Sequence, residues 1–147
     1  MISLIRTLLR HDQIVLETDT PEDLPSITCN SQQIQQVVMN LMTNARDALC
    51  DKYPEAHANK IIRLSARAFE KDGRPWLRLT VEDRGGGIPE PVRDHIFDPF
   101  FTTKPQGKGT GLGLAISYGI VKGHKGALWC ESESGEWTRF HVELPGE

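Results

Sequence analysis

Two asparagines one helical turn apart, Asn40 and Asn44, are the residues whose type and spacing first point to chemistry. Asparagine is unfavourable inside a helix because its amide competes for backbone hydrogen bonds. An amide oxygen is a neutral, hard ligand that suits Mg²⁺, and the amide NH₂ group can donate to a phosphate. The two residues also fit an ordinary solvated helix edge, so they do not establish a site by themselves.

A carboxylate followed by three glycines forms a second group. Asp83 stands at the end of an expected strand and precedes Gly85, Gly86 and Gly87. Glycines let the chain turn and let a flat ligand approach the backbone closely. A carboxylate at the back of an apolar pocket accepts a hydrogen bond from an exocyclic amine such as that of adenine. The alternative interpretation is a plain three-glycine turn between a strand and a helix.

Four alternating glycines, Gly107, Gly109, Gly111 and Gly113, open directly into an expected helix. Exposed backbone N–H groups and a helix N-terminus together form an anion site that suits a polyphosphate. The segment matches neither the Walker A pattern nor G-x-G-x-x-G, so the usual nucleotide fingerprints are absent.

The stretch from residue 98 to 113 has no hydrophobic periodicity and is rich in Gly, Thr and Lys. We interpret it as a lid that closes over a bound nucleotide. The alternative is that its phenylalanines pin a long loop onto the core. The apolar anchors are Phe97, Phe100 and Phe101, and the groups able to reach phosphate are Thr102, Thr103, Lys104 and Lys108.

The elements that position these groups follow from hydrophobic spacing and turn residues. Apolar residues recur at steps of three and four from Ile34 to Leu49, which predicts a helix with one side on a sheet and Ser31 as its N-cap. Strands joined by short turns, with helices between them, indicate an α/β fold, a two-layer sandwich of helices on one face of a mixed sheet. The expected helices are residues 31–50, 90–95 and 112–124, and the expected strands are 13–19, 61–69, 76–83 and a hairpin over 126–145.

Composition narrows the function classes. The net charge is −3 with no cluster of Lys and Arg, which argues against a nucleic-acid groove. No apolar run approaches the ~20 residues that span a bilayer, so we expect no membrane contact by this domain. The three cysteines are scattered and form no C-x-x-C pair, which argues against metal and disulfide frameworks and favours a cytoplasmic location.

Four segments in order resemble the four sequence boxes of sensor histidine kinases, within the wider group of Bergerat-fold ATPases: NLMTNARDAL, DRGGGI, FDPFFTTK and GTGLGLA. The likeness extends over about residues 13–145. It implies a mixed five-stranded sheet covered on one face by three helices, and an ATP-binding catalytic domain over residues 13–147. Residues 1–12 would then be the end of a preceding dimerisation helix or a linker.

The resemblance also assigns roles. Asn44 would be the Mg²⁺ ligand, Asn40 would lie near the phosphates, and Asp83 would bind the adenine amine of ATP. Thr138 would support the adenine–Asp83 contact through water. The catalytic set implied is Asn40, Asn44 and Lys104. Gly85, Gly87 and Ile88 would lie beside the base, and Lys104, Lys108, Gly109, Thr110, Gly111, Leu112 and Gly113 along the phosphates.

Two departures from the family pattern bear on these roles. Many relatives carry a lysine three residues after the second asparagine, where this chain has Asp47. Lys104, Lys108 or Arg46 would then supply the missing cation. The late segment often reads G-x-G-T in relatives, whereas residues 135–138 read GEWT here, which puts the detail of that hairpin in doubt.

The identity of residue 40 separates kinase from ATPase. Hydrolytic relatives of the fold carry glutamate at the position of Asn40, where a carboxylate can take the proton from water. A carboxamide has no useful basicity, so Asn40 favours phosphoryl transfer to a nucleophile that needs no base, such as a neutral imidazole. The alternatives are an ATP-hydrolysing domain and a nucleotide-binding module that regulates without catalysis.

The phosphate acceptor is expected outside this chain. The family's acceptor histidine is followed by an acidic residue and lies on a long helix hairpin, a setting that none of the five histidines here has. We interpret all five as structural or surface residues: His11, His57, His95, His124 and His141. The implied partners are a dimerisation and phosphotransfer helix hairpin and a response regulator, in a full-length homodimer of which this fragment alone would be monomeric and inactive.

Overall fold

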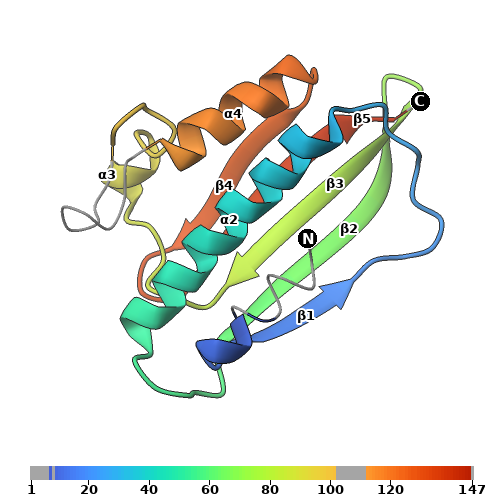
Figure 1. Ribbon diagram of the computed structural model, residues 1–147. Coiled ribbons are helices and arrows are strands. Elements are labelled where there is room, and N and C mark those ends of the chain that lie inside the picture. Colours follow the sequence, from blue (N-terminus) through green and yellow to red (C-terminus); the bar gives the residue numbers. More distant parts are fainter. Residues whose placement is uncertain (1–6, 8, 102–111, 147) are drawn as a thin grey trace.

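The computed structural model describes residues 7, 9–101 and 112–146 (Figure 1). It shows a five-stranded sheet with helices on one face, in the order β-α-β-β-α-α-β-β. The elements are β1 (Val15–Asp19), α2 (Ser31–Lys52), β2 (Ile61–Lys71), β3 (Arg74–Asp83), α3 (Glu90–Arg93), α4 (Gly113–Gly123), β4 (Ala127–Glu133) and β5 (Trp137–Pro145).

The strands lie in the order β1-β2-β3-β5-β4. β1 is parallel to β2, and the other three pairs are antiparallel. The sheet is therefore mixed, as the sequence predicted. The parallel pair arises because α2 connects β1 to β2, and a crossover is the connection that parallel strands require.

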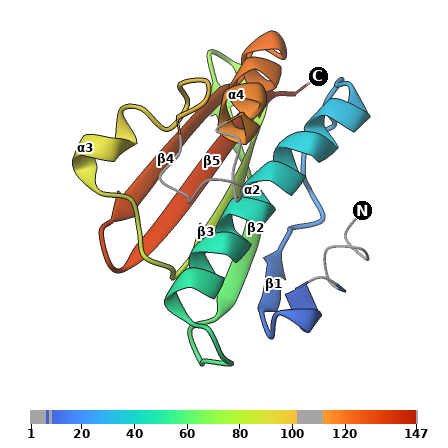
Figure 2. The same cartoon turned by 60° about the vertical axis from the view of Figure 1, so that its left-hand side comes forward.

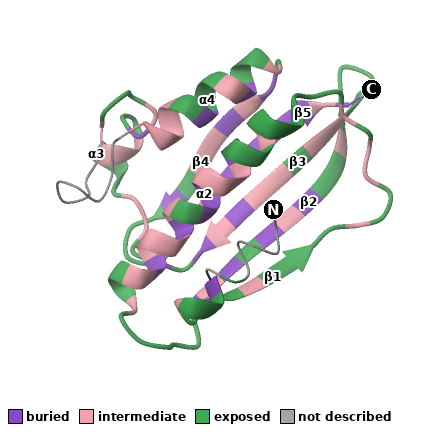
Figure 3. Ribbon diagram, in the orientation of Figure 1, coloured by how far each residue is buried: buried purple, intermediate pink, exposed green. Residues whose placement is uncertain are grey.

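α2 and α4 lie side by side across one face of the sheet, as the two views agree (Figures 1 and 2). The third expected helix, α3, is a single turn of four residues. Alternate residues of each strand point toward the helices, and buried positions occur along the strands and along α2 (Figure 3). The largest fully buried side chains are Leu41, Leu49, Ile62, Leu144, Val37, Val121 and Val142.

α2 follows the predicted apolar stripe but begins differently. Its buried residues include Leu41, Ala45 and Leu49, which recur at steps of four. The N-cap is Asn30, not Ser31, because the Asn30 side chain accepts a hydrogen bond from the Gln33 N–H at 3.1 Å. Asn30 has the extended backbone of a capping residue (φ −77°, ψ 105°), so the prediction of Ser31 was one residue late.

The face of the sheet away from α2 and α4 carries charged and aromatic side chains, such as Arg78 over the rings of Phe69 and Trp129. A cross-strand row of alternating charge runs over all five strands: Glu17, Arg63, Glu82, Arg139 and Glu131. Opposite charges directly across a ladder stabilise the pairing modestly. His141 and Glu143 lie on the same face but are buried among their neighbours.

Two histidines hold elements together. His141 is buried in β5, and its ring nitrogens lie 2.9 Å from the Thr80 hydroxyl and 2.6 Å from a Glu131 carboxylate oxygen. His124 follows α4, and its Nε2 accepts from the Asn30 N–H at 3.1 Å. Both contacts agree with a structural role for these two residues.

The N-terminal part of the chain is only partly described. Leu9 and Arg10 are helical and Leu9 is buried, but residues 1–6 and 8 of the helix end or linker expected over residues 1–12 lie outside the described residues. The boundary between residues 12 and 13 stays a prediction. Within the described ranges, no helix is both long and apolar enough to cross a bilayer.

Candidate nucleotide-binding site

One side of α2 organises the candidate site. Asn40, Asn44, Ala48 and Lys52 follow each other at steps of four and therefore share that side. Asn40 contacts the start of α4, while Ala48 and Lys52 contact the glycine turn after β3. Eight residues of helix separate Asn40 from Ala48, or about 12 Å. The strip therefore suits an extended ligand with chemically different ends.

Asn40 joins α2 to α4. Its Nδ2 lies 3.1 Å from the Gly113 carbonyl oxygen and 3.0 Å from the Ser117 hydroxyl. A carbonyl only accepts, so this contact fixes which end of the amide faces α4. Both amide hydrogens are engaged there, which leaves the oxygen as the group that Asn40 can offer to a ligand. The sequence also allowed the Asn40 NH₂ group to donate to a phosphate. In this arrangement that group is already used by Gly113 and Ser117.

Asn44 is half-buried on the same side of α2, one turn after Asn40. No group of three or more His, Cys, Asp or Glu among the described residues could hold a metal ion. Mg²⁺ commonly takes one or two protein ligands and fills its sphere with phosphate oxygens and water. A single amide oxygen beside a nucleotide fits that chemistry, and the role of Asn44 as metal ligand stays a prediction.

Asp83 ends β3 with its side chain on the helix side of the sheet, and the residue is 4% exposed. One carboxylate oxygen accepts from the Gly85 N–H at 2.8 Å. Burial raises the pKa of Asp83 to about 7, and the nearby charge of Glu82 adds to the rise, while the Gly85 N–H and the charge of Lys52 oppose it. A carboxylate in such a dry setting pairs strongly with a donor group.

The turn after Asp83 requires glycine at two positions. A Cβ on Gly85 would lie 2.8 Å from the Ala48 Cβ, so the turn packs directly on α2. Gly87 has φ +69°, and its Cβ would lie 2.2 Å from the Glu133 carbonyl oxygen. Gly86 has open space around it. Close contacts therefore explain why Gly85 and Gly87 must be glycines. No contact in the structure explains the glycine at Gly86.

Lys52 fastens the glycine turn to the β4–β5 hairpin. Its Nζ donates to the Gly85 carbonyl at 3.3 Å and to the Gly135 carbonyl at 2.7 Å. The Gly135 N–H in turn donates to the Gly86 carbonyl at 2.6 Å. Lys52 was not predicted from the sequence, although its spacing of eight from Asn44 places it on the strip. The turn formed by GEWT, in doubt from the sequence, holds through Gly135 at φ +82°.

Thr138 lies beside Asp83 because the two residues are directly paired across β3 and β5. Its hydroxyl is 3.1 Å from that of Ser132, its partner on β4. Ser132 also accepts from the Ile88 N–H at 2.7 Å. The structure therefore brings Asp83, Thr138 and Ile88 together as predicted, and adds Ser132, which the sequence analysis did not single out.

Several predicted residues stay untested. Lys104, Lys108, Gly109, Thr110 and Gly111 lie outside the described residues, whereas Leu112 and Gly113 open α4.

Arg46 does not supply the cation missing at Asp47. Its guanidinium forms an ion pair with Asp12, and it follows Asn44 by two residues, which places it roughly opposite on the helix. The ion pair argues against Arg46, one of the three alternatives for this cation. Lys104 and Lys108 remain as candidates.

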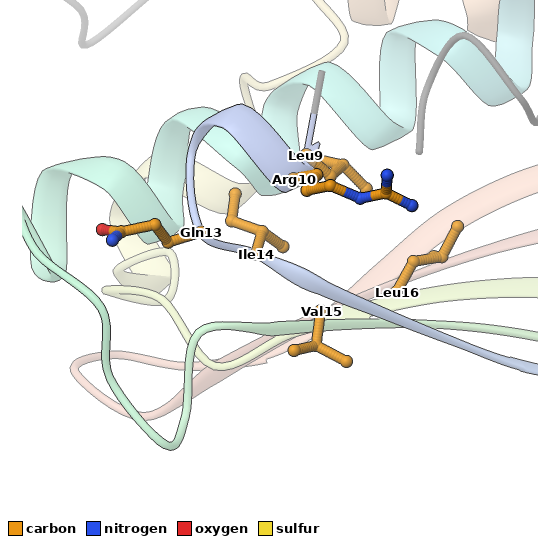
Figure 4. Close-up of a pocket in the computed structure, with 6 residues that line it drawn as sticks. All are labelled: Leu9, Arg10, Gln13, Ile14, Val15 and Leu16. Atoms are coloured by element: carbon orange, nitrogen blue, oxygen red, sulfur yellow. The ribbon is translucent and has the colours of Figure 1, made fainter. Parts of the chain in front are cut away.

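An open hollow of about 370 Å³ lies elsewhere, at the edge strand β1 (Figure 4). None of the predicted site residues lines it. Its lining residues are Leu9, Arg10, Gln13, Ile14, Val15 and Leu16.

Comparison with known proteins shows to which family this chain belongs. Residues 29–147 match the family of histidine kinase-, DNA gyrase B- and HSP90-like ATPases. The chain belongs to this family. Among its relatives, the two-component sensor PprA of Pseudomonas aeruginosa is 40% identical over 137 residues, 93% of this chain and 14% of PprA. The sensor kinase CckA of Brucella abortus is 40% identical over 141 residues, 90% of this chain and 14% of CckA.

Solved structures of the family share the fold. The catalytic domain of histidine kinase ThkA has a TM-score of 0.78 at 31% identity, covering 98% of this chain and 86% of that domain. Full-length ShkA, in complex with AMPPNP, has a TM-score of 0.76 at 26% identity and covers 99% of this chain and 29% of ShkA. These likenesses confirm the resemblance to sensor histidine kinases and the Bergerat fold. The chain spans only a small part of the curated sensor kinases that it matches.

Proposed function

We propose that this chain is the ATP-binding domain of a protein-histidine kinase, which transfers the γ-phosphoryl group of Mg-ATP to a histidine of an adjacent helix-hairpin domain. The names of its relatives as sensor kinases support this assignment. So does the strip along α2, which has a buried carboxylate at one end and a helix N-terminus at the other.

The polarity of the strip orients the nucleotide. Asp83 and Thr138 offer acceptors for the adenine amine at the glycine-turn end. The phosphates then extend toward Asn40 and the start of α4, where backbone N–H groups favour anions. Asn44 lies between these ends and would hold Mg²⁺, which neutralises charge on the phosphate oxygens.

The observation that carries kinase rather than ATPase chemistry is the Asn40 carboxamide. Its NH₂ group is used to anchor Gly113 and Ser117, and its oxygen has no useful basicity. Water is a poor nucleophile without a base, whereas a neutral imidazole nitrogen attacks without one. Asn40 thus positions the nucleotide segment and leaves the nucleophile to another domain.

The partners in this proposal are the kinase's own dimerisation and phosphotransfer hairpin and a response regulator, in a cytoplasmic homodimer. The name of PprA as a two-component sensor supports a response-regulator partner.

The test measures binding and transfer separately. Titration calorimetry with Mg-ADP should show a Kd between micromolar and millimolar, and Asn44→Ala should weaken the Mg²⁺-dependent part. Radiolabelled phosphate should reach histidine only after the kinase's hairpin domain is added. Steady-state phosphate release by the unmodified chain at about one per second or more would contradict the proposal, because it would place the chain with the hydrolytic relatives. Asn40→Asp, which introduces a carboxylate, is the variant expected to raise hydrolysis.

A further inference from the structure

Ser132 has every hydrogen-bonding position of its hydroxyl occupied. The residue is 9% exposed and lies on the helix side of β4. Its Oγ lies 2.7 Å from the Trp137 carbonyl oxygen, 2.7 Å from the Ile88 nitrogen and 3.1 Å from the Thr138 hydroxyl. A serine hydroxyl has one hydrogen and two lone pairs, so these three contacts use all of its capacity.

The direction of each bond follows from its partner. The Trp137 carbonyl can only accept, so Ser132 donates its single hydrogen there. The Ile88 N–H can only donate, so it takes one lone pair of Ser132. The remaining lone pair faces Thr138, whose hydroxyl must therefore donate to Ser132. Thr138 is left with lone pairs alone for any ligand.

This polarity matters because Thr138 stands beside Asp83. The two residues are directly paired across β3 and β5, and each is 4% exposed. An ionised Asp83 carboxylate, like Thr138 in this arrangement, can only accept hydrogen bonds. Together they form a lining that favours a hydrogen-bond donor and repels the lone pairs of a carbonyl.

We propose that Ser132 fixes Thr138 as an acceptor and thereby sets the preference of the pocket for a purine with a 6-amino group over one with a 6-oxo group. This inference rests on the proposed adenine-nucleotide function. Ser132 acts here as a positioning residue. Without it, the Thr138 hydroxyl is free to turn and donate to a 6-oxo group.

The test compares ADP with inosine diphosphate, which carries a 6-oxo group in place of the amine. Calorimetry at pH 8 gives the ratio of the two Kd values for the wild type, Ser132→Ala and Ser132→Thr. We expect Ser132→Ala to lower the preference for ADP by about fivefold or more, and Ser132→Thr, which keeps the hydroxyl, to retain it. A loosened turn would weaken both nucleotides alike, so the ratio separates specificity from structure.

Matched controls make the outcome decisive. Ser134→Ala alters an exposed serine on the same hairpin and should leave the ratio unchanged. If Ser132→Ala does not fold, Ser132→Cys carries the same expectation, because a thiol is a weak donor and acceptor. An unchanged ratio in a folded variant that binds ADP overturns the role of Ser132 alone. Failure of the wild type to bind ADP refutes the proposed function instead.

Discussion

Asp83 should make both stability and nucleotide affinity depend on pH. Burial is the main cause that raises its pKa from 3.8 to about 7 in the folded chain. The folded state therefore binds the proton more tightly than the unfolded state between these pH values. The stability that Asp83 contributes is present in full below about pH 4 and is lost as the pH rises to about 7. A rise of about three in pKa corresponds to about 4 kcal/mol.

Asp83→Asn removes this dependence while keeping an oxygen that accepts from Gly85. We expect the variant to gain about 4 kcal/mol in unfolding free energy relative to the wild type between pH 4 and pH 8. Urea denaturation of both proteins across that range measures the difference. A difference that does not change with pH would show that Asp83 ionises normally, and would refute the reasoning from burial.

Affinity should change in the opposite sense, because the ionised carboxylate accepts from the adenine amine more strongly than the protonated acid, whose O–H would face the amine as a second donor. With a pKa of about 7, the ionised fraction falls about tenfold from pH 8 to pH 6, and ADP affinity should fall with it. Asp83→Asn should bind ADP more weakly throughout, and it corrects for titration of the phosphates themselves. Lys52→Met should move the midpoint to higher pH, since the charge of Lys52 favours the ionised form.

Three further predictions use matched pairs. Gly87→Ala should abolish ADP binding and lower the melting temperature, because its Cβ meets the Glu133 carbonyl, whereas Gly86→Ala should do neither. Asn30→Ala should cost about 1 kcal/mol in urea denaturation through loss of the helix cap, and Ser31→Ala much less; equal costs would contradict the cap. Arg46→Ala should leave ADP affinity unchanged in calorimetry, and a tenfold loss would restore Arg46 as a phosphate-binding cation.

Local spacing was enough to predict most of the fold. The stripe on α2 and the strand alternation are set by the same residues that form the core, because a slip in register would turn Ile62 or Leu64 toward solvent. The turn residues between β2 and β3 could have predicted the strand ends more closely. The β2–β3 turn is only Asp72 and Gly73, both at positive φ (55° and 73°), as the D-G pair favours. The two strands therefore extend to Lys71 and from Arg74, beyond the bounds of 61–69 and 76–83 predicted for them.

Only those residues of the candidate site that form a recognisable pattern within one short segment could be predicted from the sequence. Asp83 and the glycines after it can be recognised from their residue types alone. The contacts that hold this turn in place come from residues far away in the sequence. Lys52 reaches Gly135 across 83 positions, and Asn40 reaches Ser117 across 77. Such pairs are ordinary polar residues when taken alone. Their roles exist only after the sheet has brought the hairpin beside the glycine turn.

In the proposed function, the two ends of the α2 strip favour one direction of nucleotide binding over the other. At the glycine turn, Asp83 and Thr138 present acceptors in a buried setting, and a phosphate placed there would meet negative charge with little screening. At the other end, α4 begins at Gly113, and its first N–H groups give a partial positive charge that favours anions. Asn40 holds that helix start against α2 through Gly113. In the proposed function, Asn40 thereby sets where the phosphates lie. A carboxamide can fill this positioning role without acting as a general base.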